Sequence, residues 1–171
     1  IIDLMNKSSQ DLVTTASEKL DMKQQFYVDL SNQLISDSTF TKNLFQISNA
    51  GIGKDELRRR TTEMRDVFDR LALSDQSIRD ITLLPLQNSL EIISTEREAL
   101  NPDLRNANWV QTIRSANGKP VWMPIEEKGY IRDSPKPLFA YGRLLGKNNV
   151  GSEDFILLVQ IEANVLQTLV N

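Results

Sequence analysis

The chain has 171 residues, a mass of 19.5 kDa, 40% apolar residues and 25% charged residues, which suits one ordinary globular domain with a single core. It contains no cysteine and no histidine, which excludes thiol nucleophiles, the usual zinc sites, haem held by histidine, and acyl transfer with a histidine base. The net charge of −3 argues against general nucleic-acid binding, because phosphate neutralisation needs an excess of lysine and arginine. We therefore expect no metal, no cofactor and no nucleic-acid partner.

The apolar runs and the first residue of the chain indicate whether it spans a membrane and whether it is part of a longer protein. The longest purely apolar run, residues 155–159, is far shorter than the roughly 20 residues that a membrane-spanning helix needs. The chain begins at Ile1 and contains no signal-peptide pattern. We therefore expect it to be an excised piece or a processed product of a longer protein.

Helical spacing of apolar residues dominates the first part of the chain, which has no glycine or proline before Gly51. From Ile2 to about Ile35, apolar residues recur at roughly 3.6-residue intervals; they are Met5, Leu12, Ala16, Leu20, Tyr27, Leu30 and Leu34. This pattern predicts one helix about 50 Å long, which exceeds what a compact domain of this size needs.

Two shorter helices are predicted next, so that residues 1–75 form a helical segment. Asp37 and Ser38 are suitable N-terminal caps for the first of them, whose apolar residues are Phe40, Leu44 and Phe45. The glycines of the stretch 51–53 end it. The next helix has Asp55 and Glu56 in its first turn, where the helix dipole favours anions, and its apolar seam is Leu57, Met64, Phe68 and Leu71.

The second half predicts short strands separated by turn residues, over 77–86, 89–94, 120–125, 137–145 and 154–162. One helix interrupts them, with Asn101 as its cap, Pro102 at its first position and Gly118 as its stop. This order predicts an α+β fold in which a long N-terminal helix packs on a PAS-like, five-stranded antiparallel sheet with a helix across it. We expect the sheet subdomain over 76–162 and a C-terminal helix over 163–171.

The charged motifs each have a functional and a structural interpretation. The run 58–60 is three arginines, as in a patch for nucleic acid or anionic lipid, but Glu56, Glu63 and Asp66 interleave with it and favour a solvated helical face with ion pairs. The stretch 51–54 lacks the strand and further glycines of a phosphate loop, so we expect a turn between helices. The carboxylates in predicted turns have no residue that orients them as a catalytic pair, so we expect no enzyme; they are Glu126, Glu127, Asp133, Glu153 and Asp154.

Aromatic residues and arginines gather in one stretch of the second half. This mixture is typical of a small-molecule pocket, because aromatic walls exclude water and a guanidinium binds carboxylate, phosphate or hydroxyl groups in a fixed direction. An alternative interpretation places the two tryptophans in the core and the arginine heads in water. The candidate ligand-binding residues are Trp109, Arg114, Trp122, Tyr130, Arg132, Tyr141 and Arg143.

Arg143 is the first candidate for orienting a ligand. On the predicted strand it shares one face with Phe139 and Tyr141, because alternate side chains of a strand point the same way. An ion pair with Glu126 or Asp154 would instead make Arg143 structural.

The segment 108–124 resembles the Cache-type sensor regions of bacterial methyl-accepting chemotaxis proteins and of YesM-like sensor histidine kinases. The similar features are a helix with Trp109, then Gly118, then a strand that reads Trp-Met-Pro at 122–124. The stretches 138–145 and 154–162 resemble the last two strands of that family. The resemblance implies an extracytoplasmic ligand-sensing domain of a cell-membrane receptor, with transmembrane segments adjoining its first and last helices.

The family resemblance also bears on the ligand, the partner and the mechanism. Family members that bind amino acids usually have an arginine two residues before a Trp-Tyr pair, whereas here Arg105 lies four residues before Trp109 and Val110 replaces the tyrosine. We therefore expect an organic acid or a sugar-like ligand, and the alternative that the domain binds no small ligand stays open. We expect a homodimer through the long helix, and a ligand-dependent packing of sheet on helix that moves the helix at the membrane.

Two further functions stay open at this point. The first is a helical dimerisation or interaction module whose α+β half is only a scaffold. The second is a carboxylate-dependent hydrolase.

Overall fold

The computed structural model describes residues 2–87, 90–145 and 154–168, with the side chains of 2–6, 12, 13 and 168 outside the description. Three helices come first: α1 (Ile2–Ser36), α2 (Ser38–Ile47) and α3 (Lys54–Leu73). The strands are β1 (Ile78–Pro85), β2 (Ile93–Ser94), β3 (Val121–Glu126), β4 (Leu138–Leu145) and β5 (Phe155–Glu162). Between β2 and β3 lie η1 (Leu104–Asn106) and α4 (Asn108–Ser115), and α6 (Val165–Thr168) follows β5. The predicted α+β order is confirmed.

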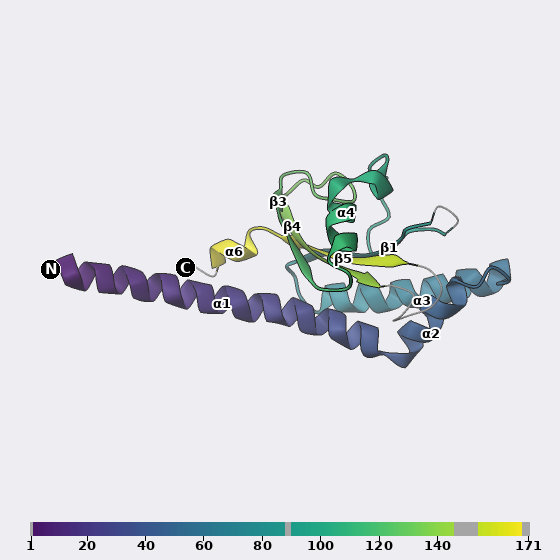
Figure 1. Ribbon diagram of the computed structural model, residues 1–171, viewed down its shortest axis with the longest axis horizontal. Coiled ribbons are helices and arrows are strands. Elements are labelled where there is room, and N and C mark those ends of the chain that lie inside the picture. Colours follow the sequence, from purple (N-terminus) through teal and green to yellow (C-terminus); the bar gives the residue numbers. More distant parts are fainter. Residues whose placement is uncertain (1, 88–89, 146–153, 169–171) are drawn as a thin grey trace.

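The five strands form one antiparallel sheet in the order β2-β1-β5-β4-β3. Long apolar runs such as 155–159 suit the inner strands, because both faces of these strands are covered. The helices α1, α2 and α3 lie on one face of the sheet and α4 lies on the other (Figure 1). Each face therefore has its own hydrophobic cluster. Except for β2, the strands begin and end within one residue of their predicted bounds.

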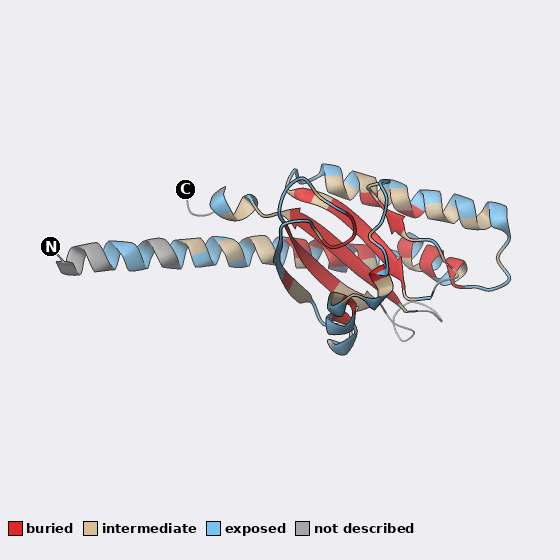
Figure 2. Cartoon of the chain, turned by 90° about the horizontal axis from the view of Figure 1, so that it is seen from above, coloured by how far each residue is buried: buried red, intermediate tan, exposed pale blue. Residues whose placement is uncertain are grey.

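The long helix α1 passes under the sheet with its C-terminal part only (Figure 2). There Tyr27, Leu30 and Leu34 are buried, which confirms the predicted stripe over this part. Met5 and Leu12 lie outside the described side chains. The free part of α1 and the short α6 extend from the same end of the sheet (Figure 1). Within the described residues, no helix is long and apolar enough to cross a membrane.

The two shorter helices form as their caps and seams predict. The Oδ1 atom of Asp37 accepts a hydrogen bond from the backbone N–H of Phe40 at 2.8 Å, which caps α2. Met64 and Phe68 of α3 are fully buried, because the apolar seam of this helix faces the sheet. The stretch 51–53 is the turn between α2 and α3.

The strand predicted over 89–94 is wrong in its length, because only Ile93 and Ser94 pair with β1; residues 88–89 lie outside the described residues. Pro85 of β1 has no N–H to donate at the position where the pairing would continue. The side chain of Arg105 donates hydrogen bonds where backbone pairing between the two strands would otherwise continue. Its Nε donates to the carbonyl oxygen of Pro85 at 2.7 Å, and its Nη2 donates to that of Leu90 at 3.2 Å.

The helix predicted to begin at Pro102 is also wrong in its start. Asp103 has left-handed backbone angles, φ 51° and ψ 33°, and this conformation cannot continue a right-handed helix. A single 3₁₀ turn, η1, follows, and α4 begins only at Asn108. The predicted stop is confirmed, since Gly118 also has a positive φ, 95°, after the end of α4.

Candidate functional site

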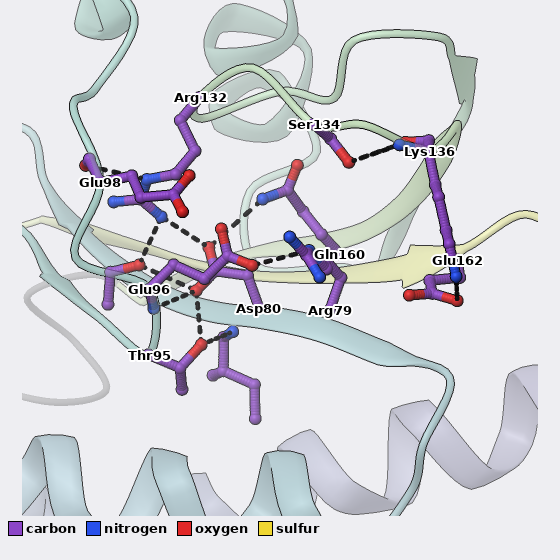
Figure 3. Close-up of polar contacts among 12 residues, drawn as sticks. Arg79, Asp80, Thr95, Glu96, Glu98, Arg132, Ser134, Lys136, Gln160 and Glu162 are labelled. Atoms are coloured by element: carbon purple, nitrogen blue, oxygen red, sulfur yellow. Dashed lines mark hydrogen bonds and ion pairs between the residues drawn. The ribbon is translucent and has the colours of Figure 1, made fainter.

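A buried carboxylate lies on the α4 face of the sheet. Asp80 alternates with Ile81 along β1, so its side chain points away from α1, and only 1% of its surface is exposed. Hydrogen-bond donors from β1, β2, β5 and the neighbouring loops converge on this carboxylate, and Figure 3 shows those of Thr95, Arg132 and Gln160 around Asp80. The hydroxyls of Thr82, Ser94 and Thr95 donate at 2.6, 2.8 and 2.6 Å. The amide Nε2 of Gln160 and the backbone N–H of Glu96 both donate at 3.3 Å.

Arg132 completes this network from the loop between β3 and β4 (Figure 3). Its Nη1 lies 3.5 Å from Oδ2 of Asp80 and 3.0 Å from Oγ of Ser94, and its Nε donates to the backbone oxygen of Glu98 at 3.1 Å. The residue is buried, with 4% of its surface exposed. A buried charge pair supported by these hydrogen bonds holds the guanidinium in one orientation.

A cavity of about 270 Å³ adjoins Arg132; it is lined by Arg65, Ile92, Ser94, Glu96, Arg97, Glu98, Leu100 and Arg132. Three arginines face two glutamates there, and Glu96 is already paired with Arg79 at 2.7 Å. Burial raises the pKa of Glu96, although the charge of Arg79 opposes this. The cavity therefore carries an excess of positive charge and is small enough to match a ligand of a few heavy atoms.

Three of the predicted site residues lie around a different hollow. Trp109, Trp122 and Tyr130 line a space of about 300 Å³ between α4 and β3. The rings of Trp109 and Tyr130 meet edge to face at 6.1 Å. The hydroxyl of Tyr130 donates to the backbone oxygen of Pro124, and burial raises its pKa to about 12. The backbone N–H of Tyr130 donates to Oε1 of Gln160 at 2.9 Å, which connects this hollow to the Asp80 network.

Tyr141 and Arg143 lie on the opposite face of the sheet, against α1. The predicted sharing of one face by these two residues and Phe139 is confirmed, since the pairing register alternates along β4. The hydroxyl of Tyr141 is 2.8 Å from that of Ser31, and Nη1 of Arg143 donates to Oδ1 of Asn32 at 2.6 Å. These contacts attach the sheet to α1.

The predicted residues therefore do not form one pocket. Of the predicted residues, only Arg132 lines the charged cavity. Trp109 and Tyr130 line the hollow between α4 and β3, and Trp122 borders it while its ring packs against those of Tyr27 and Tyr141 on the α1 face. Arg114 is exposed near the end of α4. Sequence reasoning missed Asp80, Ser94, Arg97, Glu98 and Gln160. Asp80 and Gln160 did leave a signal, because each is a polar residue within a strand that is otherwise apolar.

Within residues 2–87, 90–145 and 154–168 there is no cluster of three or more acidic side chains that could hold an ion. Among the carboxylates that were weighed as a catalytic pair, Glu126, Glu127 and Asp133 are exposed and Asp154 is half-buried, while Glu153 lies outside the described residues.

The fold matches solved sensory domains along nearly the whole chain. The sensory domain of the Campylobacter jejuni chemoreceptor Tlp3 with isoleucine bound has a TM-score of 0.70 at 15% identity, over 99% of this chain and 64% of that one. The extracellular domain of vpHK1S-Z8, assigned as a histidine kinase, has a TM-score of 0.69 at 13% identity, over 99% and 63%. The chain shares the fold of these sensory domains. The resemblance derived from the sequence is thereby confirmed for the fold.

A third similar structure is the ligand-binding domain of the Pseudomonas aeruginosa PAO1 amino-acid chemoreceptor PctC in complex with GABA. It has a TM-score of 0.58 at 11% identity, over 99% of this chain and 67% of that one. The chain spans just under two thirds of the length of the Tlp3 and vpHK1S-Z8 domains. No protein-family model matches the sequence, and no curated protein matches it.

Proposed function

We propose that this chain is the extracytoplasmic ligand-sensing domain of a bacterial transmembrane receptor, either a chemoreceptor or a sensor histidine kinase. The observation that carries the proposal is Arg132, a buried guanidinium that Asp80 and Ser94 hold in place beside a charged cavity. The fold shared with sensory domains of both receptor types supports the same function. Binding, and not catalysis, is the role of such a site.

The ligand of this site is a small molecule with a carboxylate. A planar guanidinium suits a carboxylate because it donates two parallel hydrogen bonds. Among the described residues, Nη2 of Arg132 has no hydrogen-bond partner, and Arg97 lines the same cavity. The sequence favours an organic acid or a sugar-like ligand, and the charged cavity favours the acid. Glu98 on the same wall suits an additional cationic group on the ligand.

The contacts between the sheet and α1 provide a route for the signal. Ser31 and Asn32 of α1 form hydrogen bonds with Tyr141 and Arg143 of β4. The hydroxyl of Tyr27 lies 2.5 Å from that of Ser77, just before β1. A ligand that favours one packing of the sheet on α1 shifts the helix along or about its axis. In the full-length receptor, transmembrane segments adjoining α1 and α6 carry this movement onward, and two copies associate through α1.

A thermal-shift screen of the chain against organic acids, amino acids and sugars tests this function. A ligand at 100 times its dissociation constant adds about 2.7 kcal/mol of stability, so we expect Tm to rise by roughly 5–10 °C. Arg97→Gln removes one cation of the cavity and should weaken binding by about tenfold. Arg114→Gln is the matched control, because Arg114 is exposed and outside this cavity.

Two results would count against the proposed site. One is a screen in which carboxylates leave Tm unchanged. The other is a ligand whose affinity responds equally to Arg97→Gln and Arg114→Gln.

A further inference from the structure

A second charged cavity lies on the other side of β2, between α3 and the segment 90–93. The helix α3 supplies six of the ten lining residues, at positions separated by three or four residues; they are Lys54, Leu57, Arg58, Thr61, Thr62 and Arg65. The rest of the wall is Ile47, Leu90, Glu91 and Ile93. The volume of this cavity is about 350 Å³.

The three arginines of the run 58–60 have different roles. Arg60 is bound on both sides, by Glu56 at 2.9 Å and by Oδ1 of Asn43 at 2.9 Å, as the interleaved acids of the sequence predict. Arg59 is exposed and does not line the cavity. Arg58 lines the cavity, and within the described parts of the chain no acidic group lies within ion-pair distance of it.

The cations of this cavity exceed its acids. Lys54, Arg58 and Arg65 face a single carboxylate, that of Glu91. The Nε atom of Arg65 is buried and has no hydrogen-bond partner in the described residues. A buried donor without a partner is costly, so an anion that accepts its hydrogen bond gains affinity from satisfying it.

The apolar part of the wall restricts the kind of anion. Four aliphatic side chains meet the cations in the same space, namely Ile47, Leu57, Leu90 and Ile93. Burial of a ligand's hydrocarbon against such a wall is favourable, whereas a fully hydrated inorganic ion makes no favourable contact with it.

We propose that this cavity is a second binding site, separate from that of Arg132, for a small carboxylate with a hydrocarbon body. The carboxylate binds Arg58 and Arg65, and the hydrocarbon lies against the aliphatic wall. Arg65 lines both cavities, whereas Arg58 lines only this one, so Arg58 is the residue that distinguishes the two sites.

The test is an NMR titration of the full chain, labelled with ¹⁵N, using hexanoate as the probe. Hexanol and acetate are the controls for the charge and for the hydrocarbon. We expect saturable shifts at the amides of Thr61, Thr62 and Glu91, and weaker binding of both controls. Arg58→Gln should raise the dissociation constant of hexanoate by about tenfold, and Arg59→Gln should change it by less than about twofold.

Several results would overturn this second site. They are the absence of saturable shifts at these amides, an effect of Arg58→Gln no larger than that of Arg59→Gln, or hexanol binding as tightly as hexanoate. Shifts confined to Glu98 and Leu100 and abolished by Arg97→Gln would assign the probe to the Arg132 cavity. In that case the second site fails while the proposed function stands.

Discussion

A buried guanidinium is stable only where its charge is compensated and its donors are satisfied. For Arg132, Asp80 compensates the charge, and Ser94 and the backbone of Glu98 accept hydrogen bonds from Nη1 and Nε, which leaves Nη2 for a ligand. Asp80 in turn takes most of its hydrogen bonds from neutral groups, such as the hydroxyl of Thr82. The pair is therefore both a structural element of the sheet and the anchor of the cavity.

Removal of Arg132 should be strongly destabilising, because it leaves the buried carboxylate of Asp80 without its counter-charge. We expect Arg132→Met to lower the free energy of unfolding by about 3–5 kcal/mol. The additional change Asp80→Asn should cost less in this background than in the wild type, and urea unfolding of the four proteins measures the coupling. Arg114→Met, on the exposed end of α4, should cost no more than about 0.5 kcal/mol. Equal costs for the two arginine variants would refute the structural role.

Asp75 is a residue through which the stability of the fold should depend on pH. It accepts hydrogen bonds from Nζ of Lys23 at 3.1 Å and from the backbone N–H of Ser77 at 2.8 Å. Burial alone would raise its pKa, but the hydrogen bonds from Ser77 and Lys23 outweigh burial and lower the pKa from its ordinary value of 3.8. A carboxyl with a lowered folded pKa stabilises the fold above its unfolded pKa, and this stability is lost as the pH falls through the folded pKa.

We expect Asp75→Asn to lower the free energy of unfolding by about 1 kcal/mol near neutral pH, with the difference shrinking below about pH 4. Urea unfolding of both proteins between about pH 3 and pH 7 measures this difference. Asp21→Asn, exposed on α1, serves as the control. A gap between Asp75→Asn and the wild type that stays constant over this range would contradict the assignment.

Among the elements, α4 lies very close to the sheet, and a glycine allows this approach. A Cβ atom added at Gly142 of β4 would lie 2.4 Å from Cδ1 and 3.1 Å from Cγ1 of Ile113. Ile113 belongs to the hydrophobic cluster on the α4 face, and Gly142 is also buried. The contact sets the height of α4 above the sheet, and hence the shape of the hollow that Trp109 lines.

Gly142→Ala should therefore cost about 1–3 kcal/mol through overpacking. Ile113→Val removes Cδ1 and alone should cost about 0.5–1.5 kcal/mol. The double variant should be more stable than the sum of the two costs implies, because the removed atom is the one that the new methyl group meets. Strictly additive costs in urea unfolding would show that the close contact is not the cause.

The sequence predicts those elements whose signals are local. Helical spacing and the cap at Asp37 are sufficient for α1, α2 and α3, and apolar runs are sufficient for the four longer strands. The two errors came from interactions that no local pattern contains. Arg105 binds carbonyl groups that β2 would otherwise pair with, and Asp103 adopts a left-handed conformation before α4.

The site was less predictable than the fold for the same reason. Arg132 could be named from its surroundings in the sequence, but its partner Asp80 lies 52 residues away in the chain. The prediction that Tyr141 and Arg143 share one face of their strand was correct, but it does not tell which face of the sheet a long helix will cover. Alternation along the strand therefore predicted that these residues lie together, but it did not predict that they contact α1.

On the scale of the whole molecule, α1 presents exposed apolar side chains. Met22 is 73% exposed and Phe26 is 42% exposed, and the two lie one helical turn apart. We expect weak self-association of the chain through this part of α1, because an exposed apolar patch favours a partner. Sedimentation at increasing concentration measures it.

Phe26→Glu should abolish this self-association, whereas Phe45→Glu, at an exposed apolar residue of α2, should leave it unchanged. A strict monomer at high concentration, or equal effects of the two variants, would contradict association through α1.

A crystal structure of the chain with the best ligand of the thermal-shift screen tests most directly whether a small carboxylate binds beside Arg132. We expect the carboxylate of the ligand within hydrogen-bond distance of Arg132 and near Arg97. A ligand held between α4 and β3 beside Trp109, or against α1 at Arg143, would contradict binding beside Arg132.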